Sequence, residues 1–188
     1  GDHHAAFAAG DDLIAVKTSA SLVDGIKTSE IDMISASICA SLIIENNDYD
    51  AMATRIAISD LHKNTYGDLS RYASELTSYE YRTITINILH PTVIAFIKRY
   101  RMDLEKVVDY KKDYLNNYFG VITLIKSYLL AYKYDNDVKV TKERPQQMML
   151  RVAIGINMAS IDEDGSASKE TIASIIDTYK LLSDKFYT

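Results

Sequence analysis

The sequence predicts a mainly α-helical fold. Apolar residues recur at the spacing of a helix along most of the 188 residues, whereas convincing alternation of apolar and polar residues is scarce. The hydrophobic fraction of 47% is sufficient for a buried core in one domain or two small ones. We therefore expect helices packed on helices, with at most a short β-hairpin.

The first clear helix is expected to begin at Thr28, because Ser29 followed three residues later by Asp32 resembles a capping box. Its apolar stripe consists of Ile31, Ile34, Ile38 and Leu42. A second helix over residues 51–62 follows an Asn-Asn-Asp turn that can cap it. Its predicted buried residues are Ala53, Ile56, Ala57 and Leu61.

A polar connection through Gly67, rich in tyrosine and serine, leads to the pair His90 and Pro91, and proline suits the first turn of a helix. The stripe of that helix is Val93, Phe96, Ile97, Tyr100, Leu104 and Val108. Residues 116–120 break the helical pattern. It resumes with Ile122, Ile125, Leu129 and Tyr132.

Residues 133–142 alternate charged residues with apolar ones, which is compatible with a short β-hairpin or with a loop. Pro145 then starts another helix. Its inward residues are predicted to be Met149, Val152 and Ile156. Residues 162–168 are acidic and small and predict an exposed loop before a last helix. That helix is expected to bury Ile172, Ile175, Ile176, Tyr179, Leu182 and Phe186.

Charge and hydropathy argue against two classes of partner. A net charge of −5 and scattered basic residues do not provide the basic face that nucleic acid requires. The most apolar run, residues 148–158, is interrupted by Arg151 and is far shorter than the roughly 20 residues of a membrane span. Residues 1–12, with His3 and His4, are interpreted as a tail or tag remnant without a secretory signal. We expect a soluble, cytoplasmic protein that binds neither nucleic acid nor membrane.

The sequence contains no complete catalytic set. Phosphate-binding glycine loops, paired cysteines and nucleophile elbows are absent. The single cysteine, Cys39, lies within an apolar helical pattern and is predicted to be an inert, packed thiol. His62 and His90 each stand alone and are interpreted as helix caps or packed rings. Residues 162–164 lack the ligand spacing of a calcium loop, so no metal site is expected.

Four ordered blocks resemble the N-terminal part of class I ribonucleotide reductase large subunits. Residues 28–32 and 48–63 look like the end of that family's ATP-cone. Residues 117–130 are similar to its NYFGFKTLxxSYLL stretch, residues 143–155 to its ERPQHMLMRVxxGI helix, and residues 178–188 to the TYxLLSxxxFT segment that follows. The resemblance implies partial ATP-cone helices over residues 13–66 and a helical N-terminal domain over residues 67–188.

The departures from the family pattern shape the functional expectation. The β element that opens the ATP-cone is missing, and residues 162–168 look like an insertion. The family reaction requires a thiyl-radical cysteine and a cysteine pair, carried by a catalytic barrel that this chain is expected to lack. The resemblance therefore transfers no catalytic residue. The alternative is a reductase-derived, non-catalytic structural or regulatory subunit of a larger assembly.

Two residues match family positions that contact the adenine nucleotide, Asp32 and Lys63. The resemblance implies that they bind ATP or dATP as an effector, and a lysine beside phosphates is physically sensible. Their structural alternatives are a capping-box acid and a charge at the C-terminal end of a helix dipole. The implied partners are the catalytic barrel, on the same or a separate polypeptide, and the radical-generating small subunit. No other cofactor is expected.

Overall fold

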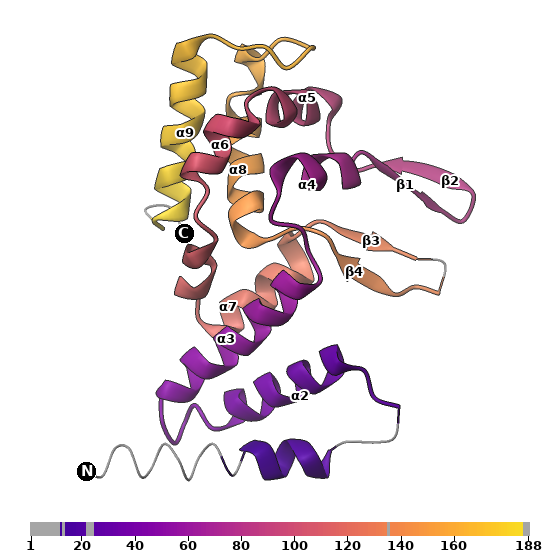
Figure 1. The fold of residues 1–188 in the computed structure, drawn as a ribbon, viewed down its shortest axis with the longest axis vertical. Coiled ribbons are helices and arrows are strands. Elements are labelled where there is room, and N and C mark those ends of the chain that lie inside the picture. Colours follow the sequence, from indigo (N-terminus) through magenta and orange to yellow (C-terminus); the bar gives the residue numbers. More distant parts are fainter. Residues whose placement is uncertain (1–11, 13, 22–24, 135, 186–188) are drawn as a thin grey trace. The chain divides into compact units, whose positions relative to one another are not determined.

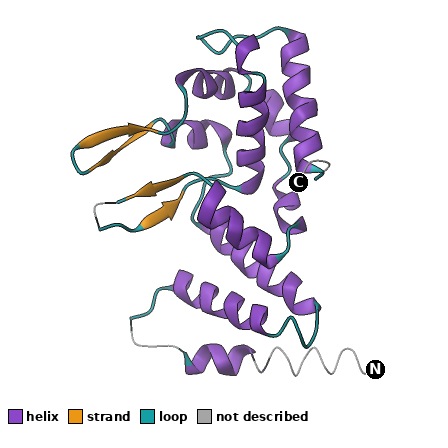
Figure 2. Cartoon of the chain, turned by 180° about the vertical axis from the view of Figure 1, so that it is seen from behind, coloured by secondary structure: helices purple, strands orange, loops and turns teal. Residues whose placement is uncertain are grey.

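The computed structural model describes residues 12, 14–21, 25–134 and 136–185. Within them the chain is mainly α-helical with two small antiparallel hairpins, which confirms the predicted fold class (Figures 1 and 2). The chain forms two compact units: Gly1–Leu61 with Asn116–Thr123, and His62–Leu115 with Leu124–Thr188. The predicted tail, apart from Asp12, lies outside the described residues, and the predicted boundary between residues 66 and 67 stays a prediction.

The first unit contains helical residues 14–20 and α2 (Thr28–Ser41), which begins where the sequence predicted. The predicted capping box is wrong in register. The N-cap is Lys27, whose backbone N–H donates to the Glu30 carboxylate over 3.1 Å, so Asp32 lies in the second turn. The completely or almost completely buried residues near its end are Ala36, Cys39 and Leu42. Of the predicted stripe, Ile31, Ile34 and Ile38 are only half-buried.

The first unit continues with α3 (Asp48–Lys63) up to Leu61 and with α7 (Tyr118–Thr123). The acidic residues in the first turn of α3 interact favourably with the positive, N-terminal end of its helix dipole. Asp50 in that turn also accepts the backbone N–H of Tyr118 over 3.1 Å and so holds the start of α7. The buried residues of α3 are Ala53, Thr54, Ala57, Ile58 and Leu61. Residues predicted to break the pattern therefore include the start of a short helix.

The second unit begins with elements that the sequence reading missed. The supposed polar connection contains α4 (Leu69–Glu75) and a hairpin of β1 (Ser78–Tyr81) and β2 (Ile84–Asn87). Asp68 caps α4 by accepting the N–H of Arg71 over 2.7 Å. The hairpin turn uses Arg82 and Thr83 at positive φ, positions where glycine or asparagine would have signalled a turn. Each strand alternates tyrosine or isoleucine with polar residues over only four positions, and none of these residues is buried, so the pattern is short and weak.

The long helix predicted after Pro91 is two helices, α5 (Pro91–Arg99) and α6 (Arg101–Val107). The His90 ring caps α5 by accepting the Thr92 N–H over 3.3 Å, which confirms one of its predicted roles. The break falls at Tyr100. Its hydroxyl donates to the Ala167 carbonyl over 3.2 Å and accepts the Ala167 N–H over 3.1 Å. This tertiary anchor explains why an uninterrupted apolar pattern does not give one helix.

A 3-10 turn (η1, Tyr110–Leu115) and a π-helical turn (η2, Leu124–Tyr128) precede the second hairpin. That hairpin pairs β3 (Ala131–Lys133) with β4 (Lys139–Thr141), which confirms the hairpin alternative. Tyr132 lies on a strand, so its predicted place on a helix is wrong. Its ring stacks on Tyr79 with centroids 4.5 Å apart, and the two hairpins lie side by side (Figure 1).

The chain ends in α8 (Pro145–Ile156), a short 3-10 turn (η3, Met158–Ser160) and α9 (Lys169–Ser183). In α9, Ile175 and Tyr179 are buried as predicted, Ile172, Ile176 and Leu182 are half-buried, and Phe186 lies outside the described residues. Of the predicted inward residues of α8, Met149 is half-buried against the core, whereas Val152 and Ile156 are exposed, so the prediction is wrong for these two. The buried residues of α8 are Pro145, Gln146, Gln147, Leu150, Ala153 and Ile154.

The loop over residues 162–168 is exposed at its carboxylates, as predicted, but it is docked on α5. Gly165 is buried at φ +78°, and a Cβ there would lie 2.4 Å from the backbone nitrogen of Phe96. Only glycine permits this approach. Asp164 also pairs with Arg99 at 2.8 Å.

The core of the second unit lies between α4, α5, α6, α8 and α9. Its largest fully buried side chains are Tyr72, Phe96, Leu69, Leu76, Ile97, Leu104, Leu150, Ile154, Ile175 and Tyr179. Among the described residues, no helix combines the length and apolar character needed to cross a bilayer. Helix-on-helix packing is thus the framework that positions the polar residues described next.

Candidate functional site: a buried polar network

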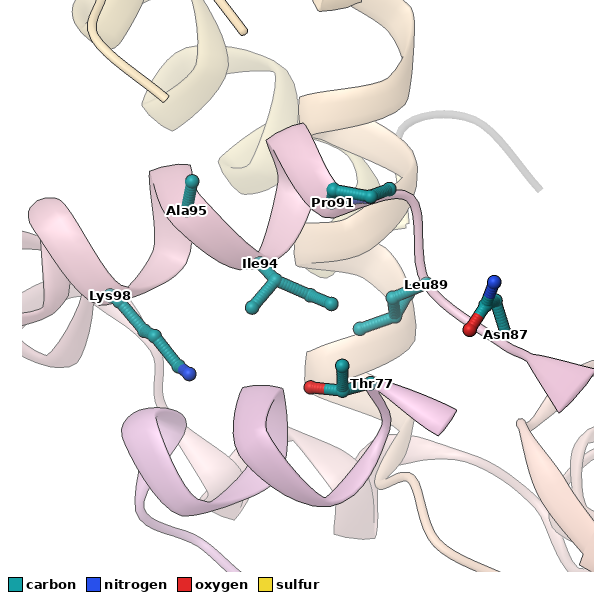
Figure 3. Close-up of a pocket in the computed structure, with 7 residues that line it drawn as sticks. All are labelled: Thr77, Asn87, Leu89, Pro91, Ile94, Ala95 and Lys98. Carbon is teal, nitrogen blue, oxygen red and sulfur yellow. The ribbon is translucent and has the colours of Figure 1, made fainter. Parts of the chain in front are cut away.

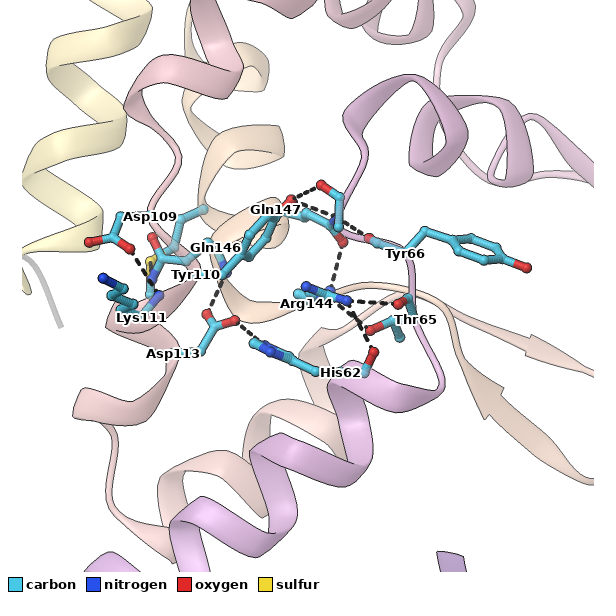
Figure 4. Close-up of polar contacts among 12 residues, drawn as sticks. His62, Thr65, Tyr66, Asp109, Tyr110, Lys111, Asp113, Arg144, Gln146 and Gln147 are labelled. Carbon is cyan, nitrogen blue, oxygen red and sulfur yellow. Dashed lines mark hydrogen bonds and ion pairs between the residues drawn. The ribbon is translucent and has the colours of Figure 1, made fainter.

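A network of polar side chains gathers around the start of α8, within the second unit (Figure 4). Its centre is a run of four residues that α8 and the segment before it provide: Glu143, Arg144, Gln146 and Gln147. Glu143 and Gln147 are fully buried, and Gln146 is 1% exposed. Buried polar groups are tolerated only when they are hydrogen-bonded. Most partners of these residues come from segments far away in the sequence, and Arg151 of α8 itself pairs with Glu143.

Asp113 on η1 connects α8 to the end of α3. Its fully buried carboxylate accepts the backbone N–H of Gln146 over 3.0 Å and lies 2.7 Å from Nε2 of His62. The first contact caps a helix start, where backbone N–H groups lack partners and a negative charge is favourable. Burial raises the pKa of Asp113, while the hydrogen bond and charge of His62 oppose that rise. His62 is thus a partner of a buried acid and does not stand alone.

Glu143 forms the second part of the network. Its two carboxylate oxygens accept hydrogen bonds from Nε and Nη2 of Arg151 over 2.9 and 3.0 Å, and the two bonds form a bidentate ion pair. They also accept the Tyr72 hydroxyl over 2.6 Å and the Leu130 N–H over 2.9 Å. Burial, and then the charge of Glu143, raise the pKa of Tyr72 well above its ordinary value. Tyr72 therefore stays a neutral donor to a carboxylate whose hydrogen bonds are filled.

Arg144 ties α8 to the chain just after α3. Its guanidinium donates to the Thr65 hydroxyl over 3.0 Å, and to the carbonyls of Thr65 and His62 over 2.8 and 3.0 Å. It also lies 4.8 Å from the centre of the Tyr110 ring, within the range of a cation–π contact. Gly67 leaves room for it, since a Cβ there would be 2.9 Å from Nη1.

The two glutamines close the network. Gln147 donates to the Tyr66 carbonyl over 2.6 Å and to the Tyr110 hydroxyl over 3.0 Å. Burial raises the pKa of Tyr110 to about 12, so its hydroxyl remains a donor, to the Gly67 carbonyl over 2.7 Å. The side-chain oxygen of Gln146 accepts the hydroxyls of Tyr179 and Ser183 on α9 over 2.7 and 2.8 Å.

The hydrogen bonds of this network hold helices together. Each buried acid is already occupied by donors from the chain, so none is left as a free base or nucleophile toward a substrate. No group of three His, Cys, Asp or Glu residues suited to a metal occurs among the described residues. Cys39 is completely buried and forms no disulfide, which confirms its predicted packed position. A buried thiol of this kind cannot reach a substrate in the folded state.

The two residues proposed from the sequence to contact nucleotide lie in different units. Asp32 is half-buried in the second turn of α2, in the first unit. It is not the acid that caps α2, since Glu30 does this. Lys63 is exposed and belongs to the second unit. It is the last residue of α3, where its positive charge interacts favourably with the negative end of the helix dipole.

A pocket of about 380 Å³ opens between the end of α4, the base of the first hairpin and α5 (Figure 3). Its lining residues are Thr77, Asn87, Leu89, Pro91, Ile94, Ala95 and Lys98. The floor is apolar, and Lys98 is the one titratable residue of the lining. The pocket contains neither a general base nor a nucleophile.

No family model matches this sequence. Individual relatives do match it. The large subunit of ribonucleoside-diphosphate reductase from Monkeypox virus is 37% identical over 180 residues, which cover 93% of this chain and 21% of the viral protein. The corresponding proteins of Cryptosporidium parvum and Arabidopsis thaliana are 36% and 32% identical, over 89% and 94% of this chain and 19% and 20% of their own lengths.

This chain is homologous to the N-terminal region of the ribonucleotide reductase large subunit. The resemblance predicted from the four sequence blocks is thereby confirmed. The chain spans about a fifth of the length of the relatives that it matches.

The reductase-like block over residues 143–155 is the block that supplies the centre of the network. Its Glu-Arg-Pro-Gln sequence gives a buried acid, an anchoring arginine, the proline that starts α8 and a buried amide. Sequence reasoning recognised the block but missed these roles. His62 and Asp113 are 51 residues apart, and no local pattern indicated that they pair.

Proposed function

We propose that this chain forms the N-terminal helical portion of a ribonucleoside-diphosphate reductase large subunit. Ribonucleotide reduction, the step that supplies deoxyribonucleotides for DNA replication, would be performed by residues outside these 188. The observation that carries the proposal is the similarity to three large subunits along about nine tenths of the chain. The saturated network supports an architectural role, because its buried acids are committed to holding helices together.

The proposal includes the expected partners. A catalytic barrel, on the same or a separate polypeptide, would provide the cysteines that ribonucleotide reduction requires, and a small subunit would generate the radical. The lone Cys39 supports this division, since it is buried within the first unit. We place the assembly in the cytoplasm, where a reduced thiol is maintained.

An allosteric role is proposed for the helices at the end of the partial ATP-cone. Asp32 and Lys63 would contact ATP or dATP there, with the lysine neutralising phosphate charge. The side chain of Lys63 is exposed, so solvent and solutes reach it. Calorimetric titration with both nucleotides tests this role, with Lys63→Ala as the variant and Lys111→Ala, another exposed lysine, as the control. Absence of heat at millimolar nucleotide would remove the effector proposal and leave the architectural one standing.

The main test measures reduction of a nucleoside diphosphate. The chain is assayed alone, and then with a polypeptide that carries the rest of a large subunit together with the small subunit. We expect turnover only in the complete mixture, and co-elution of the chain with the rest of the large subunit. Turnover by the chain alone would contradict the proposal. A folded chain that fails to associate would favour the alternative, a non-catalytic subunit of an unrelated assembly.

A further inference from the structure

The outer face of α8 is apolar and is not covered by the described part of the chain. Val152 is 37% exposed and Ile156 is 66% exposed. Gly155 is exposed between them, and Met148 is half-exposed one turn before Val152. These four residues, spaced four, three and one positions apart, lie along one side of the helix. We name them the α8 outer face.

Beyond its first turn, which carries Gln146 and Gln147, α8 is therefore apolar on both sides. Its inner side contacts the core through Leu150, Ala153 and Ile154, which are completely buried. The only charged residue of α8, Arg151, is bound by Glu143 and leaves no charge on the outer face. A helical segment that is apolar on opposite sides is typical of a buried position with neighbours on both sides. Nothing among the described residues provides the second neighbour.

The neighbouring helix α9 shows the usual alternative. Its inner side buries Ile175 and Tyr179, while its exposed positions include Lys169, Glu170, Asp177 and Lys180. The two helices pack together in the same unit, so they share one solvent environment. The absence of charged residues from the exposed side of α8 is thus specific to that helix face, because the exposed side of α9 carries them.

Gly155 provides a second, independent observation. Glycine destabilises the interior of a helix. It is usually retained there when another chain segment approaches closely. A Cβ at Gly155 would meet no atom within 4 Å, so no described part of this chain requires the glycine. A close approach from outside the described residues explains it. Gly67 and Gly165, in contrast, each leave room for a contact within the chain.

We propose that the α8 outer face is the surface on which the remaining part of the large subunit packs. This inference rests on the proposed function and names the contact surface. The relatives are about five times as long as this chain, so a large body of polypeptide is available to cover the face. The bound segment is apolar and uncharged where it meets Gly155, because a buried unpaired charge would oppose association.

The first experiment measures the accessibility of α8 in the assembled large subunit. Ile156→Cys and, as control, Glu105→Cys on α6 are alkylated with a maleimide, and the modified peptides are quantified by mass spectrometry. Both positions are exposed in this chain, and the native Cys39 is completely buried. In the chain alone the two cysteines should react at similar rates. In the assembly we expect position 156 to react at least tenfold more slowly than position 105.

A second experiment adds volume at the contact. Gly155→Leu should leave the stability of the chain alone unchanged or raised, since the new side chain enters open space. It should weaken association with the rest of the large subunit at least tenfold, whereas Glu105→Leu should not. Equal labelling at positions 156 and 105 in the assembly would overturn the α8 surface while the proposed function stands. Failure of the unmodified, folded chain to associate would instead remove the proposed function.

Discussion

Two groups of polar contacts in the second unit show how burial changes the role of similar chemistry. Around Glu143, four donors converge on a carboxylate with no exposed surface. At the hairpin tips, Asp137 also collects several donors: Lys133 at 2.9 Å, the Tyr81 hydroxyl at 3.2 Å and Arg82 at 3.4 Å. Asp137, however, is 59% exposed. Water screens the second group and competes for its donors, so only the first should matter strongly for stability.

The largest effect is expected for Glu143→Ala. The substitution leaves Arg151, the buried Tyr72 hydroxyl and the Leu130 N–H without their acceptor. Breaking a buried pair from one side costs about 3 kcal/mol. The measurement is urea unfolding followed by circular dichroism. Glu143→Gln, which keeps the size and part of the hydrogen bonding, should lose less. If both variants unfold within about 0.5 kcal/mol of the native chain, burial does not separate the two groups as argued.

An intermediate effect is expected from the pH dependence at Asp113. Burial raises its pKa, so the folded state binds this proton more tightly than the unfolded chain, whose pKa is about 4. Asp113 should therefore stabilise the folded state progressively more as the pH falls from the raised folded pKa toward about 4.

The pH effect is measured by comparing the native chain with Asp113→Asn at a series of pH values between 7 and 4. Groups that do not contact Asp113 titrate alike in both proteins, so the difference reports Asp113 together with its partner His62. This difference should shift in favour of the native chain as the pH decreases. A shift in the opposite direction would show that the ionised form, paired with His62, is the one that folding stabilises.

The smallest effect is expected for Asp137→Asn. The side chain is exposed and its ion pairs are screened, although the Lys133 hydrogen bond and charge lower its pKa. The thermal midpoint should stay within experimental error of the native value, both in dilute buffer and in 0.5 M salt. A midpoint that falls as far as in Glu143→Ala would show that the tips stabilise the unit as strongly as the network does.

The sequence indicated helices more reliably than the direction in which they face. Helical spacing and proline correctly predicted the starts of α5 and α8. The inward side of α8 was predicted from Val152 and Ile156, and this was wrong because two buried glutamines occupy the inner side. A polar residue is placed inside only when partners from other segments satisfy it. Those partners, Tyr66, Tyr110, Tyr179 and Ser183, are at least 30 residues distant.

By itself, the sequence determined the helical class, the packed position of Cys39 and the resemblance to reductase large subunits, because composition, spacing and ordered motifs are local properties of the chain. The tertiary structure alone decided that His62 pairs with Asp113, that Tyr100 divides a predicted helix and that α8 presents an uncovered apolar face. Each of these depends on which distant segments meet. Such meetings are set by the packing of the whole unit, which no local pattern encodes.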